Sequence, residues 1–147
     1  MLADEVKARV DKQILLVEGK LKDIEGLIKD GKKDLAVYWL FSVYENIVEA
    51  IQDIKDNKKD FQQIKNHSLK INLLKIHTND KYAECLEKLN KAKNIGAYGH
   101  YADERYSAPI TDNDVQDCYA NARNLLEDLK SMRKTADTKG LSHQGSK

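Results

Sequence analysis

The densest group of side chains with chemical potential lies between positions 91 and 106. It combines basic, amide, imidazole and phenol groups: Lys91, Lys93, Arg105, Asn94, His100, Tyr98, Tyr101 and Tyr106. Imidazole exchanges a proton near neutral pH, a cation stabilises phosphate charge, and a Tyr ring can stack on an unpaired base. The combination favours RNA as a ligand. The alternative is structural: the Tyr rings pack in a connection, His100 hydrogen-bonds a helix end, and the lysines are solvated.

Other common catalytic and metal-binding patterns are absent from the sequence. No Glu is followed by His three positions later, so the ligand pair of di-metal helical bundles is missing. A nucleophile elbow, a phosphate-binding glycine loop and paired Cys ligands are missing too. His67 has no second ligand at metal-binding spacing, so we interpret it as a partly buried residue at a helix start. We therefore expect no metal and no cofactor.

Two cysteines fall on apolar helical stripes. Cys85 and Cys118 are 33 positions apart, with no Cys or His close to either in the sequence. This spacing fits neither a zinc site nor a secreted disulfide scaffold. We interpret both as small buried hydrophobic residues in a cytoplasmic protein, rather than as reactive thiols.

The elements that must position these residues are predicted to be helices. The 147-residue chain contains a single Pro and seven Gly, so long segments lack helix-breaking residues. Apolar residues recur every three or four positions from Val6 to Ile28, which predicts a first helix that ends at Asp30-Gly31. A second helix is expected from Asp34 to about Asp56.

The first half of that second helix is unusual. Residues 35–41 read Leu-Ala-Val-Tyr-Trp-Leu-Phe, so they are apolar on every side. Such a helix either lies at the centre of a bundle or packs a second apolar face against another subunit. Because four helices of this length leave little room for a centre, we favour a subunit contact through the surface formed by residues 38–41.

Two helices are expected before the Tyr-rich segment ends. A short helix over 66–76 has Ser68 or Asn66 as its cap. The sequence Thr78-Asn79-Asp80 is typical of a helix start, and the helix that follows should end near Gly96 or Gly99.

A last helix completes the predicted fold. Thr111-x-x-Asp114 resembles a capping box and opens a helix that continues through Met132. The fold class is therefore all-α: an antiparallel up-and-down bundle of four long helices plus a short extra helix. Residues 1–137 form one domain, and residues 138–147 form a polar tail that frays.

Charge and hydropathy limit the possible partners. The 25 basic and 24 acidic residues give a net charge of +1, so any nucleic-acid site must be local. No segment approaches the roughly 20 apolar residues that a membrane span requires. We expect a cytoplasmic protein that does not enter the membrane.

The order of these features resembles the HEPN family (higher eukaryotes and prokaryotes nucleotide-binding domain). The resemblance extends from about Leu35 to Leu129. Four features carry it: the second helix with Tyr and Trp, the start His67-Ser68-Leu69, the helix ending in Lys93-Asn94 with His100 beyond it, and the last helix after Ile110-Thr111.

The resemblance implies a fold, an activity and a site. HEPN proteins are bundles of four to five helices that usually dimerise, and many are metal-independent ribonucleases with an Arg-x4-6-His motif. Lys93-Asn94-x5-His100 has that spacing. By this resemblance His100 is the general acid or base, Asn94 orients the phosphate, and Lys93 replaces the Arg, in a cleft shared by two subunits. The substrate-binding candidates are Tyr98, Tyr101 and Arg105.

Two departures from the family pattern bear on function. Lys is a flexible point charge without the planar fork of Arg, so Lys93 should position a phosphate less well. In some HEPN toxins a partner nucleotidyltransferase modifies a Tyr two positions after the motif His. Here Tyr101 follows His100 directly and position 102 is Ala, so we do not carry that modification over.

Three functions remain open from the sequence. The first is a toxin-type or defence-type ribonuclease that cuts single-stranded RNA without metal. The second is a non-catalytic HEPN-like module that binds a small nucleotidyltransferase, a nucleotide or RNA. The third is a helical homodimer whose only role is assembly.

Overall fold

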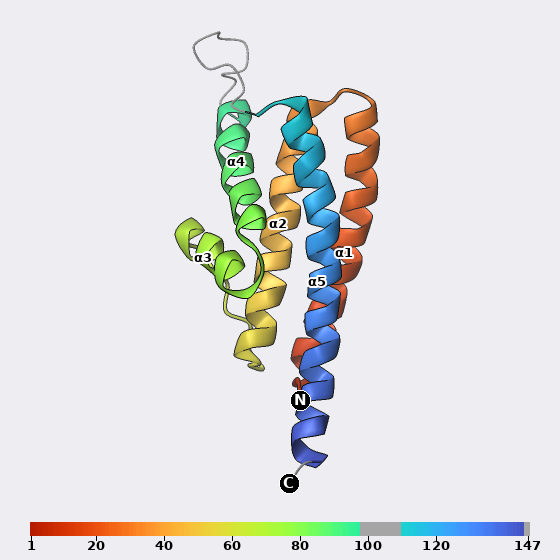
Figure 1. Ribbon diagram of the computed structural model, residues 1–147, viewed down its shortest axis with the longest axis vertical. Helices are drawn as coiled ribbons and strands as arrows, with labels where there is room; N and C mark the ends of the chain where they lie inside the picture. Colours follow the sequence, from red (N-terminus) through yellow and green to blue (C-terminus); the bar gives the residue numbers. More distant parts are fainter. Residues whose placement is uncertain (98–109, 146–147) are drawn as a thin grey trace.

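The chain forms an all-helical bundle in the computed structural model, which describes the backbone of residues 1–97 and 110–145 and the side chains of residues 1–93 and 110–137. These residues contain no strand. Successive long helices run in opposite directions, and the short third helix lies across the side of the bundle (Figure 1). The prediction of an all-α fold is confirmed. The helices are α1 (Asp4–Lys29), α2 (Lys33–Asp56), α3 (His67–His77), α4 (Asp80–Ala97) and α5 (Asp112–Gly145).

Helix α2 is the central element of the bundle, because it packs against α1, α3, α4 and α5. Ala36, Val37, Leu40 and Phe41 are buried by these neighbours. α2 therefore contacts every other helix of the described structure, but it is not covered on every side.

Three of the seven residues in segment 35–41 remain at the surface of a single chain. Leu35 is 49% exposed, Tyr38 59% and Trp39 39%. The predicted subunit contact over 38–41 is thus reduced to Tyr38 and Trp39, since Leu40 and Phe41 already belong to the core. Whether a second subunit covers the exposed residues stays a prediction.

The helix starts follow the predicted capping chemistry. The side chain of Asn66 accepts a hydrogen bond from the Leu69 N–H at 3.3 Å, so Asn66 rather than Ser68 caps α3. Asn79 precedes α4 and accepts from the Lys81 N–H at 3.0 Å. A capping box opens α5, in which the Thr111 and Asp114 side chains each accept from the other residue's N–H at 3.1 Å.

Helix ends agree with the sequence in one case and differ in another. α1 ends at Lys29, and Gly31 follows it with a φ of 71°, a backbone conformation that favours Gly. α5 continues to Gly145, past residue 137, where the sequence predicts a frayed tail. No Pro interrupts this stretch, so nothing in the sequence forces the helix to stop.

An ion pair fixes the lower end of the α1–α2 contact. Asp53 is buried, and its two carboxylate oxygens accept hydrogen bonds from Nε and one terminal nitrogen of Arg9, both at 2.8 Å. The Arg9 guanidinium also donates to the backbone carbonyls of Lys58 and Lys59, at 2.7 and 2.6 Å. Arg9 therefore ties the segment after α2 to α1.

We expect Asp53→Asn to lower the free energy of unfolding by about 1 to 2 kcal/mol, because it leaves the partly exposed Arg9 guanidinium without its buried counterion. Urea denaturation followed by circular dichroism measures the change. The matched control is Asp23→Asn, at an exposed position of α1, which should stay within about 0.5 kcal/mol of the unmodified protein. Equal stability of the two variants would contradict this account of the pair.

Candidate functional site

The predicted site lies at the C-terminal end of α4, and one of its side chains is described. Lys93 is half-buried, and its Nζ lies 4.3 Å from the centroid of the Phe41 ring on α2. Asn94 belongs to the α4 backbone, but its side chain is outside the described residues, as are Tyr98, His100, Tyr101 and Arg105. The structure therefore leaves untested whether these residues come together.

A second His lies close to Lys93. The rings of Phe41 and His67 have centroids 6.5 Å apart, so Phe41 contacts both the ammonium group from α4 and the imidazole at the start of α3. His67 is half-buried, as the sequence predicted for a residue at a helix start. Its Nε2 is buried and has no hydrogen-bond partner among the described residues. We call Phe41, His67 and Lys93 the Phe41 cluster.

The surroundings of this cluster lower the pKa of its imidazole and so favour the neutral form. Burial lowers the pKa of His67 below its ordinary value, and repulsion by the Lys70 and Lys93 ammonium groups acts in the same direction. Attraction by Glu87 and Glu45 opposes the shift without cancelling it. A neutral imidazole with an unpartnered nitrogen can accept or donate one hydrogen bond, so it can orient a polar ligand or exchange a proton with it.

Other cations beside α2 have polar partners. Lys20 from α1 donates to Ser42 Oγ and Asn46 Oδ1, both at 2.8 Å. Lys70 from α3 is buried and pairs with Glu45. Lys93 differs, because no described residue accepts a hydrogen bond from its ammonium group or forms an ion pair with it. Among these three cations, Lys93 is the one best able to bind an added anion.

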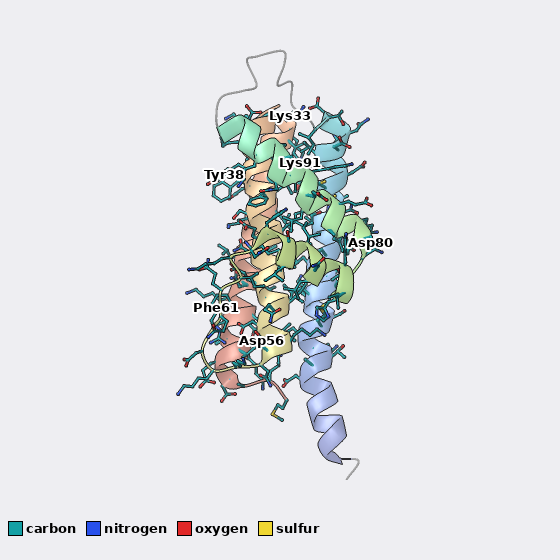
Figure 2. All side chains as sticks on the ribbon, turned by 90° about the vertical axis from the view of Figure 1, so that its left-hand side faces the viewer. Lys33, Tyr38, Asp56, Phe61, Asp80 and Lys91 are labelled. Atoms are coloured by element: carbon teal, nitrogen blue, oxygen red, sulfur yellow. The ribbon has the colours of Figure 1, made fainter. Side chains whose placement is uncertain are left out.

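The exposed aromatic residues extend from this region along α2. Tyr38 projects away from the bundle (Figure 2), and the Lys20 ammonium lies 5.6 Å from the centroid of the Trp39 ring. A Tyr and a Trp side by side on one helix can supply the central anchors of an interface or faces for base stacking.

The two cysteines are buried, as predicted. Cys85 on α4 accepts a 3.5 Å hydrogen bond from the Asn121 amide of α5. The neighbouring Cys85 and burial raise the pKa of the Cys118 thiol on α5. With little surface exposure, this pair serves the α4–α5 contact and not the candidate site.

Within residues 1–93 and 110–137, no three His, Cys, Asp or Glu side chains are grouped so that they could hold a metal ion. Among the described helices, none has the length and apolar character needed to cross a membrane.

The lowered pKa of His67 predicts a pH-dependent stability. Because the unfolded chain binds a proton at this position more readily than the folded protein, the free energy of unfolding should fall as the pH drops from about 7 toward about 5. His67→Asn removes this term, so its stability should fall less over the same range. Urea denaturation at several pH values tests it. Parallel curves for the two proteins would show that His67 has the same pKa folded and unfolded.

Comparison of the chain with protein-family models, with curated proteins and with solved structures gave no match.

Proposed function

We propose that the protein is a HEPN-like ribonuclease that cuts single-stranded RNA without metal at a site shared by two subunits. The observation that carries the proposal is the Lys93-Asn94-x5-His100 motif at the end of α4, in an all-helical bundle whose Lys93 ammonium has no carboxylate partner among the described residues. A cation that remains unneutralised by the protein retains its attraction for a phosphodiester.

The proposed reaction needs proton transfer and charge stabilisation. His100 removes the proton of the RNA 2′-hydroxyl, the 2′-oxygen attacks the phosphorus, and the 5′-oxygen leaves with a proton from a second imidazole. Pairing of two subunits supplies that second imidazole from the same sequence position. Lys93 stabilises the negative charge that develops on the phosphate, and Asn94 orients it.

The Phe41 cluster supports the role of Lys93. A cation against a buried aromatic face is restricted in position without being neutralised, because the ring contributes no formal charge. Holding the ammonium group in place partly compensates for the planar N–H geometry that Arg has and Lys lacks. The nearby Lys70 and Lys20 are already engaged with Glu45 and with Ser42 and Asn46, so we assign them no part in the reaction.

We expect the purified protein to cut unstructured RNA in the presence of EDTA, and His100→Ala to slow cleavage by at least about 100-fold, since it removes the general acid and base. Lys93→Ala should also slow cleavage, and Lys93→Arg should match or exceed the original rate because Arg binds phosphate through two N–H groups.

His143→Ala is the matched control for this experiment, because it removes an imidazole from the predicted tail and should leave the rate unchanged. Cleavage rates come from end-labelled RNA resolved on denaturing gels. Equal rates for His100→Ala and His143→Ala would rule out the proposed role of His100.

A second candidate function is a non-catalytic module that binds RNA, a nucleotide or a small nucleotidyltransferase. One observation favours it: the motif has Lys in place of Arg. Fluorescence anisotropy with labelled RNA separates the two functions. Binding that weakens in Lys93→Ala, with no cleavage by the unmodified protein, would select the module.

The ribonuclease candidate requires a homodimer, and the exposed Tyr38 and Trp39 on α2 are its proposed interface. Sedimentation velocity at about 10 μM should give the mass of two chains, and Tyr38→Lys should weaken dimerisation at least about tenfold by placing a charge in an apolar contact. Ile76→Lys is the control, because Ile76 is 74% exposed on α3. A monomeric mass for the unmodified protein would remove both the interface and the shared site.

A further inference from the structure

A cavity of about 270 Å³ lies at the opposite end of α2 from the Phe41 cluster. Its walls come from α1, from α2 and from the segment after α2, and they include Gln13, Leu16, Glu49 and Phe61. Phe61 lies beside the lower part of α1 (Figure 2). The volume is just below the range typical of drug-sized ligands, so the cavity suits a smaller molecule.

The cavity has a fixed framework. Asp53 and the backbone carbonyls of Lys58 and Lys59 together accept four hydrogen bonds from Arg9. The Arg9 guanidinium carbon also lies 5.9 Å from the centroid of the Phe61 ring. The segment that carries Phe61 is therefore attached to α1 by hydrogen bonds and by a cation–π contact. Since Arg9 is committed to these partners, it has little capacity left for a ligand.

The groups that lack partners in the cavity are hydrogen-bond acceptors. Gln13 Oε1 is buried without a hydrogen-bond partner among the described residues. The Glu49 carboxylate is half-buried, and no described residue forms a hydrogen bond or ion pair with it. A buried acceptor without a donor is costly, so a ligand that brings donors would be stabilised here.

The charges that line the cavity favour a positively charged ligand over a negatively charged one. Asp53 and Arg9 neutralise each other, and Lys12 is exposed. The ammonium groups of Lys70 and Lys20 attract the half-buried Glu49 carboxylate, but neither forms an ion pair or hydrogen bond with it. An anion would meet the carboxylates of Glu49 and Asp53, whereas a cation can pair with Glu49 and donate to Gln13. Leu16 and Phe61 provide apolar walls for the rest of the molecule.

We propose that this cavity binds a small organic cation, with an ammonium or guanidinium head directed at Glu49 and Gln13 and a short apolar body between Leu16 and Phe61. The site is separate from the Lys93 motif and does not depend on the proposed ribonuclease activity. A guanidinium head suits it well, because its planar set of N–H groups can pair with a carboxylate and still donate to an amide oxygen.

Isothermal titration calorimetry with butylguanidinium tests the proposal, and butylurea is the matched neutral probe of nearly the same shape. We expect butylguanidinium to bind with a Kd of about 1 mM or lower and butylurea to bind at least about tenfold more weakly. Equal affinity for the two probes, or no saturable heat with butylguanidinium, would overturn the proposal.

Variants locate the site. Glu49→Gln keeps the side-chain shape and removes the charge, so it should weaken butylguanidinium binding about 10- to 100-fold. Glu84→Gln makes the same change at an exposed position of α4 and should bind as the unmodified protein does. Gln13→Met removes the amide acceptor and should also weaken binding, which supplies a second test if Glu49→Gln fails to fold. Unchanged affinity in a folded cavity variant would place the cation elsewhere and refute the assignment.

Discussion

The packing of α2 against all four other helices is the constraint on which the rest of the structure depends. Burial of the largest apolar stripe in the chain stabilises this arrangement and leaves a polar strip along one side of α2. Ser42, Asn46, Glu49 and Asp53 recur along that strip every three or four residues, so they share one face of the helix. Tyr44, which is buried outside this strip, donates instead to the backbone carbonyl of Cys118 on α5.

Helices on either side of the strip supply those partners. Arg9 and Lys20 reach it from α1, and Lys70 reaches it from α3. Their positions neutralise buried Asp53 and half-buried Glu45, whose charges would otherwise be expensive in this environment. The electrostatics of the surface is thus a consequence of the packing of α2. The groups that remain without a hydrogen-bond or ion-pair partner among the described residues include the Lys93 ammonium, Gln13 Oε1 and the Glu49 carboxylate. These groups are therefore available to a ligand.

The sequence predicts local features well and long-range features poorly. The caps at Asn66 and at Thr111–Asp114 were predictable because cap and N–H lie within three residues of each other. The pairing of Arg9 with Asp53 and the contact of Phe41 with Lys93 join residues far apart in the chain, and no periodic pattern encodes them. The contacts of α2 with every other helix were not predicted for the same reason. An apolar helical sequence indicates that the helix is buried, but it does not indicate which helices bury it.

The two candidate sites differ in sign and are separated along α2. Phe41 and Glu49 are eight residues apart on one helix, which corresponds to about 12 Å. At the Phe41 end the unpartnered charge is the Lys93 ammonium, beside a neutral imidazole, and this end attracts anions. At the Glu49 end the unpartnered groups are Gln13 and Glu49, and this end attracts cations. Salt screens exposed charges over a Debye length of about 8 Å, but the groups at both ends are half-buried and the Lys70 ammonium acts on the pKa of both His67 and Glu49, so the two ends are not electrostatically independent.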